Sequence, residues 1–247
     1  MSLRAAREGR LMRVTLARPE RRNALSEDLC RRLLDAFREA DADSGIGAVL
    51  LDAEGPVFCS GMDLDESLAE NSVARTAIHE ELFLAGAHAA KPIVAAVQGG
   101  AVAGGVGLVA QAHVVIADDH AVFSLPEIWL GMWPFVIWAS IERALGERRA
   151  LALSLTGEKF NARSANQWGL VHRVVSRELL PGEALAVAGA IADAAPGAVT
   201  RGMKLAREAR ELVLDSVVAV AAGLRAEQLE SAEYRVRVAE LRAKRKS

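Results

Sequence analysis

Residues 98–108 read QGGAVAGGVGL and join a predicted buried strand, Ile93–Val97, to a predicted apolar helix. Glycines let the backbone approach a ligand closely, and the first amides of a helix have no partner inside that helix. Such donors can bind a phosphate or stabilise an oxyanion that develops during a reaction. A tightly packed turn without any ligand has the same pattern, so other segments must decide its role.

Two nucleotide-binding motifs compete for this stretch, and neither fits. A dinucleotide-binding turn needs the spacing Gly-x-Gly-x-x-Gly after the first strand of the fold. Residues 98–108 lack that spacing, and earlier strands are predicted. No Gly-Lys-Ser/Thr sequence follows, so we also set aside a phosphate-binding loop.

Short apolar strands alternate with helices over most of the chain, which predicts an α/β fold with mainly parallel pairing. After Pro181 only helices are predicted, interrupted at Pro196-Gly197. We therefore expect a core over residues 1–180 and a helical region over 181–247. The predicted strands cover residues 11–16, 48–51, 93–97, 114–116 and 171–175.

Composition bounds the possible roles of the 247-residue chain. Lysine plus arginine total 30 against 32 acidic residues, so the net charge is −2. This balance gives no support for binding to nucleic acid or to a membrane surface. The two cysteines, Cys30 and Cys59, form neither a disulfide framework nor a metal-ligand pattern. Without a signal peptide or a run of about 20 apolar residues, we expect a cytoplasmic protein.

Two further segments combine with the glycine-rich stretch. Residues 58–64 read FCSGMDL and residues 123–131 read FSLPEIWLG. In this order the three resemble the enoyl-CoA hydratase/isomerase (crotonase) family, whose members carry C-[AS]-G-x-D-[LI], a glycine-rich helix start, and [FS]-x-x-P-E-x-x-x-G. Residues 156–160 (TGEKF) and 168–171 (WGLV) are also similar to family segments. The resemblance covers roughly residues 11–175.

The resemblance implies a spiral of ββα units followed by a C-terminal α-helical trimerisation region. It implies an acyl-CoA thioester as substrate and a homotrimer or a dimer of trimers. No separate cofactor and no metal ion are expected, because coenzyme A is part of the substrate.

Three residues would carry the chemistry if the resemblance holds. The backbone amides of Met62 and Gly104 match the family's oxyanion hole, and Glu127 matches its catalytic glutamate. A carboxylate beside an enolisable thioester can remove or return a proton. The resemblance also implies that the substrate-binding residues are Arg22, Ala24, Leu25, Gly61, Asp63, Leu64, Gly105, Gly107 and Phe135.

The sequence departs from the family at two places. Gly107 stands where hydratases usually carry a second glutamate, and a glutamate there should cost little if the position is helical. Residues 134–138 (PFVIW) replace a glycine-rich stretch. An apolar wall of this kind would raise the pKa of Glu127 by desolvation. His79, with its neighbours Glu80 and Glu81, is predicted to lie on a solvated helix face, and contact of one of them with substrate is the alternative.

These departures leave the reaction open between migration of a double bond and hydration of an enoyl-CoA. One carboxylate can move a proton between two carbons, whereas hydration usually relies on two carboxylates. Decarboxylation of a malonyl-type CoA is an alternative, because it needs the oxyanion hole more than a base. A non-catalytic CoA-binding protein is the alternative from another class.

Overall fold

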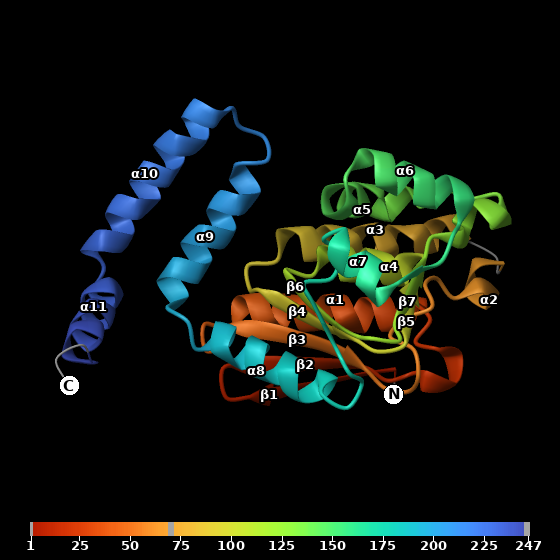
Figure 1. Cartoon of the computed structure of the whole chain (residues 1–247), viewed down its shortest axis with the longest axis horizontal. Helices are drawn as coiled ribbons and strands as arrows, with labels where there is room; N and C mark the ends of the chain where they lie inside the picture. The colour runs from red at the N-terminus through yellow and green to blue at the C-terminus, as the bar shows by residue number, and fades with distance from the viewer. Residues whose placement is uncertain (1, 69–71, 245–247) are drawn as a thin grey trace. The chain divides into compact units, whose positions relative to one another are not determined.

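A computed structural model of the chain describes residues 2–68 and 72–244 (Figure 1). The chain divides into two compact units, residues 1–192 and 193–247. The predicted boundary at residue 180 coincides with the first residue of helix α8 (Leu180–Ala192). This helix packs on the sheet of the first unit, so the division falls after it.

The first unit is built on a six-stranded sheet with the order β1-β2-β3-β4-β6-β9. Strands β1 and β2 pair antiparallel, and all the other neighbours pair parallel, as the alternating strands and helices predicted. The strands are β1 (Leu3–Glu8), β2 (Leu11–Leu16), β3 (Ala48–Ala53), β4 (Ile93–Val97), β6 (Val114–Asp118) and β9 (Arg173–Val175).

A second sheet has three short strands in the order β5-β7-β8, of which β5 and β7 pair parallel and β7 and β8 pair antiparallel. The chain runs from β4 through a corner at Gly99 into β5 and then into a helix. The φ angle of Gly99 is +66°, a conformation that favours glycine. This succession of strand, strand and helix is the expected ββα unit. The elements are β5 (Gly100–Val102), α4 (Gly104–Gln111), β7 (Val122–Ser124) and β8 (Phe160–Asn161).

Helices cover both faces of the large sheet (Figure 1). In β3, Val49 and Leu51 join the main core with helix α1 (Glu27–Ala42), whereas Ala48 and Leu50 pack against α8. Ser26 caps the start of α1, because its hydroxyl accepts the amide hydrogen of Leu29 at 3.3 Å. Alternation along the strand therefore decides which layer each side chain joins.

Two histidines fasten neighbouring parallel strands. The Nδ1 atom of His113 accepts the amide of Ile93 at 3.0 Å, and the Nδ1 atom of His172 accepts the amide of Val115 at 3.0 Å. Each histidine amide donates in turn to the carbonyl of the same residue, Ile93 or Val115. His113 therefore has a structural role.

The described residues of the second unit form helices and the turns between them, as predicted for the end of the chain. None of the described residues in α9 or α10 is buried, and apolar side chains such as Val213 and Val218 are exposed. Across the described ranges, no helix combines the length and the apolar character that a membrane crossing requires. The helices are α9 (Pro196–Glu208), α10 (Leu214–Glu230) and α11 (Ala232–Lys244).

Candidate active site

One cavity of about 580 Å³ brings the three predicted segments together. Its walls include the 58–64 loop, the start of α4 and two short 3₁₀ helices, η2 (Pro126–Leu130) and η3 (Phe135–Ile137). Three predicted glycines are not in its wall. The predicted site residues that line it are Arg22, Ala24, Leu25, Met62, Asp63, Leu64, Gly104, Glu127 and Phe135.

The amides of Met62 and Gly104 are both available as donors. Leu25 pairs with Met62 in a single β-bridge, but the bonds run from Leu25 to the Gly61 carbonyl (2.8 Å) and from Asp63 to the Leu25 carbonyl (3.2 Å). Gly104 is the first residue of α4, where an amide has no partner within the helix. Within the described residues, neither amide donates a hydrogen bond.

Close packing of two backbones brings these amides together. Gly61 has φ +87°, and a Cβ atom added there would lie 2.8 Å from Ala103 Cβ and 3.2 Å from the Gly104 nitrogen. A larger residue at position 61 would therefore push the loop away from α4. Ala103 itself has φ 52° and ψ −122°. Strain of this kind costs about 1–3 kcal/mol, and it turns the chain into α4 directly before Gly104.

Glu127 stands on η2 with its carboxyl group at the same cavity. Its Oε2 atom is buried and has no hydrogen-bond partner. Burial raises the pKa of Glu127, opposed by a hydrogen bond with its own backbone amide. A raised pKa lies closer to neutral pH, and a carboxyl group with such a pKa can both take and return a proton. The direction agrees with the effect expected from an apolar wall.

Asp63 lines the cavity, but arginines hold its carboxylate. Arg18 donates to it at 3.2 Å and Arg21 at 3.3 Å, and Asp63 also caps helix α2 (Leu64–Ser67). Burial alone would raise the pKa of Asp63, but the hydrogen bonds from Arg18 and Arg21 outweigh it and hold the pKa below its usual value. This ion pair ties the loop that carries Met62 to the segment after β2.

Arg22 reaches the cavity without such a partner. It ends the short helix η1 (Pro19–Arg21) with φ 51°, and its carbonyl accepts the amide of Ser60 at 3.0 Å. Its guanidinium is exposed and makes no hydrogen bond or ion pair within the described residues. Arg22 therefore presents a free positive charge at the cavity, while its neighbour Arg21 is engaged by Asp63 and Asp65.

Gly61 is one of the three predicted glycines outside the cavity wall, and the other two, Gly105 and Gly107, lie in α4. A Cβ atom on Gly105 would lie 3.0 Å from Cys59 Cβ. A Cβ atom on Gly107 would lie 2.9 Å from both Ile137 Cβ and Phe83 Cε1. The place for the side chain of residue 107 is thus filled by two apolar residues, and both of them line the cavity. A small cost for a glutamate at this helical position was expected only if the glycine is not closely packed. The helix is packed on that side, so the side chain has no room.

Sequence reasoning favoured a solvated face for His79 over contact with substrate, but this residue lines the cavity from helix α3 (Ser72–His88). Its two neighbours follow the prediction: Glu80 is exposed, and Glu81 is exposed and paired with Arg38. The available signal was the spacing of His79 and Phe83, which places them on one helix face. Apolar residues elsewhere in α3 made this face hard to distinguish from the others.

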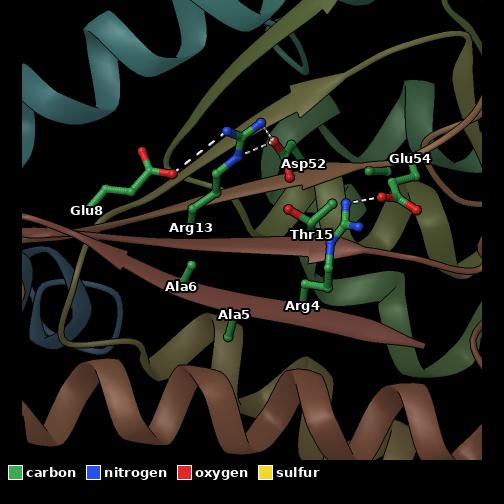
Figure 2. Close-up of a pocket in the computed structure, with 9 residues that line it drawn as sticks. Arg4, Ala5, Ala6, Glu8, Arg13, Thr15, Asp52 and Glu54 are labelled. Carbon is green, nitrogen blue, oxygen red and sulfur yellow. Dashed lines mark hydrogen bonds and ion pairs between the residues drawn. The ribbon is translucent and has the colours of Figure 1, made fainter. Parts of the chain in front are cut away.

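A second hollow of about 540 Å³ lies on the β1-β2-β3 part of the large sheet (Figure 2). Figure 2 shows Arg13 bonded to Asp52, with Nη2 and Oδ2 2.7 Å apart, and Arg4 paired with Glu54. Its arginines are already neutralised, and none of the predicted site residues lines it. Within the described residues, no group of three or more His, Cys, Asp or Glu side chains could hold a metal ion.

Comparisons with known proteins agree on one family. The family model described as enoyl-CoA hydratase/isomerase matches residues 6–246. The 2,3-dehydroadipyl-CoA hydratase of Escherichia coli K12 is 33% identical over 217 residues, which cover 87% of this chain and 85% of the relative. Mevalonyl-coenzyme A hydratase sidH of Aspergillus fumigatus is 33% identical over 193 residues, or 76% and 72%. A crystal structure of an enoyl-CoA hydratase from Mycobacterium smegmatis superposes with a TM-score of 0.94 at 31% identity, covering 99% of this chain and 97% of that one.

The hydrogen bonds from Arg18 and Arg21 to Asp63 lead to a prediction about stability. Asp63→Asn should lower the free energy of unfolding by about 1.5–3 kcal/mol at neutral pH, because hydrogen bonds to a charged acceptor are lost. The lowered pKa means that this stabilisation is present above about pH 4 and is lost as the pH falls through the pKa of the folded protein. Urea unfolding across pH measures it.

Asp65→Asn is the matched control, since the Asp65 side chain is 77% exposed and meets the same Arg21. Its effect should stay within about 1 kcal/mol. An equal decrease in the free energy of unfolding in the two variants would show that the hydrogen bonds to Asp63 have no special role.

Proposed function

This chain belongs to the enoyl-CoA hydratase/isomerase family, and we propose that it converts an acyl-CoA thioester through an enolate. One observation carries the proposal: the unpaired carboxylate oxygen of Glu127 belongs to the same cavity as the free amides of Met62 and Gly104. A proton acceptor and an oxyanion site are the two parts that enolate chemistry requires.

The two amides would hold the thioester carbonyl oxygen. As Glu127 removes a proton from the α-carbon, the electron pair of that C–H bond forms the enolate and negative charge develops on the oxygen. A fixed donor aimed at such an oxygen is worth about 2.7–4 kcal/mol in the transition state. Backbone donors on Met62 and Gly104 are held in place by packing, so little reorganisation is needed during the reaction.

The protonated Glu127 then completes the cycle. In a 3-enoyl-CoA, the α-proton returns to the γ-carbon of the dienolate, the double bond moves to the 2,3-position, and Glu127 is regenerated as the carboxylate. Burial raises the pKa of Glu127 and so brings it closer to the operating pH. This supports both the removal and the return of the proton.

Arg22 suits the phosphates of coenzyme A, which enters as part of the substrate. It is a free guanidinium at the edge of the cavity, and the neighbouring Ala24 and Leu25 offer an apolar surface beside it. An arginine can form paired hydrogen bonds with a phosphate.

Double-bond migration is favoured over hydration by the packing around Gly107. Ile137 and Phe83 fill the space that a second carboxylate would need. Among the described residues of the lining, Asp63 and Asp65 are ion-paired and Glu20 is exposed on η1, so Glu127 is the buried carboxylate with an unpaired oxygen. The names of the relatives favour hydration, whereas the packing around Gly107 favours isomerisation. We give more weight to the packing and propose that isomerisation is at least as fast as hydration.

The helical unit supports the expected homotrimer or dimer of trimers. Val213 and Val218 are 74% and 59% exposed, and the described part of α10 buries no residue. Exposed apolar side chains on one unit are typical of an interface between copies. A cytoplasmic location stays a prediction.

Glu127→Gln should lower turnover by about 10²- to 10⁴-fold with little change in affinity for the CoA ester, because the amide keeps the shape but cannot carry the proton. In the unmodified enzyme kcat/KM should fall as the pH drops through the pKa of Glu127, which burial raises above its usual value, since the carboxylate form is the base. Steady-state kinetics across pH measures both. Glu158→Gln, on an exposed glutamate outside the cavity, is the control. If Glu127→Gln keeps full turnover, Glu127 is not the base and a decarboxylase gains support.

Restoring a carboxylate at position 107 should favour hydration only when space is made for it. Gly107→Glu alone should destabilise the protein, whereas combining it with Ile137→Gly removes one of the two obstructing side chains, the one at the N-cap of helix α5 (Trp138–Leu145), where glycine is tolerated. The double variant should raise the ratio of hydration to isomerisation by about 10²-fold, the lower end of the range for a general base.

Ile137→Gly alone is the matched control, since it opens the space without adding a carboxylate. Product positions are read by NMR, with melting curves for every variant. An unmodified protein that hydrates efficiently and isomerises poorly would contradict this assignment.

Light scattering should give the mass of three or six copies at micromolar concentration. Val218→Asp should lower that mass, because it places a charge among the exposed apolar residues of α10. A monomer in the unmodified protein would contradict the trimer.

A further inference from the structure

His79 lies on the side of the cavity that borders the proposed oxyanion hole. It stands one helical turn before Phe83 on α3, and both residues line the cavity. A Cβ atom on Gly104 would lie 3.6 Å from Phe83 Cζ and 3.1 Å from Leu25 Cδ1. His79 therefore shares its helix face with a side chain that packs beside the amide of Gly104.

The imidazole of His79 is only partly satisfied by the protein. Its Nε2 atom lies 3.4 Å from the Leu25 carbonyl, which also accepts the amide of Asp63. A carbonyl oxygen only accepts, so this contact places the proton on Nε2 and leaves Nδ1 as an acceptor in the neutral ring. In the described part of the chain, Nδ1 has no partner.

The free ring nitrogen of His79 is an acceptor among apolar groups of the cavity wall. Leu25 and Phe83 are buried hydrophobic residues, and Met62 adds a further apolar side chain. Nδ1 is open to solvent at the cavity, so water can bind it when no ligand is present. A ligand that displaces this water without replacing its hydrogen bond loses affinity, so the imidazole points to a polar partner in the ligand.

We propose that His79 determines acyl specificity by hydrogen-bonding an oxygen substituent, a hydroxyl or a carboxylate, on the acyl chain. The inference rests on the proposed function, which locates the thioester carbonyl at Met62 and Gly104. The coenzyme A phosphates are assigned to Arg22 at the edge of the cavity. The wall formed by Phe83 and Ile137 is left for the acyl chain, and His79 stands on the Phe83 face of α3.

The two oxygen groups make different demands on the ring. A hydroxyl can donate to the free Nδ1 of the neutral imidazole, whereas a carboxylate accepts only and requires the protonated ring, in which both nitrogens donate. A methyl group in the same place leaves Nδ1 without a partner. Substrates that differ only in this end group therefore separate the possibilities.

The test uses saturated CoA esters with acyl chains of equal length that end in methyl, hydroxyl or carboxylate, in one shorter and one longer set. Isothermal titration calorimetry measures their affinities for the full-length protein and for His79→Leu. We expect an oxygen-ended ester to bind the unmodified protein at least tenfold more tightly than its methyl partner. His79→Leu should abolish that preference while keeping the affinity for the methyl ester.

Two further variants separate recognition from structural support. His79→Gln keeps a polar group at the cavity and should retain part of the preference. Glu80→Gln changes the exposed neighbour on the same helix and should change nothing. Equal affinity of all end groups for the unmodified protein, or a preference that survives in His79→Leu, would overturn the proposal.

Turnover of the matching enoyl-CoA esters is measured in parallel. If no ester is turned over but the His79-dependent binding preference is present, the proposed activity fails and the binding site stands. If the esters are turned over without any effect of His79→Leu on end-group preference, the activity stands and this inference fails.

Discussion

The approach of the 58–64 loop to the start of α4 is the constraint on which the site depends. Gly61 leaves just enough room for the loop to pass Ala103 and Gly104, and the strained backbone of Ala103 turns the chain into the helix there. The ion pair between Asp63 and Arg18 holds the loop from the other side. Packing, local strain and electrostatics thus act together to keep two amides free of protein partners.

The cavity is lined by arginines in one segment and by apolar side chains in others. Arginines stand at the segment after β2, where Arg21 is engaged by acidic residues and Arg22 is free. The lining also includes Ile137 and Phe83, which are almost entirely buried. A cavity with this division suits a ligand that is anionic at one end and mostly apolar at the other. The buried carboxyl of Glu127 has its pKa raised within the same cavity.

Much of the fold and of the site could be predicted from the sequence. Alternating strands and helices indicated the parallel sheet, and the order of three motifs indicated that Met62, Gly104 and Glu127 would meet. Local patterns could not predict what fills the space beside Gly107, because Ile137 reaches it from a segment thirty residues later by tertiary packing. A solvated face was favoured for His79 over contact with substrate, because α3 has apolar residues around much of its circumference. The engagement of Asp63 by Arg18 likewise depends on a contact between distant segments.

The central claim is that this cavity forms an enolate by proton exchange with Glu127. Exchange of the α-protons of a saturated acyl-CoA with deuterium oxide, followed by NMR, isolates that step from both hydration and isomerisation. We predict enzyme-dependent loss of the α-proton signal in the unmodified protein and none above the uncatalysed rate in Glu127→Gln. Exchange at equal rates in the two proteins, or no exchange in the unmodified protein while it turns over an enoyl-CoA, would contradict the account.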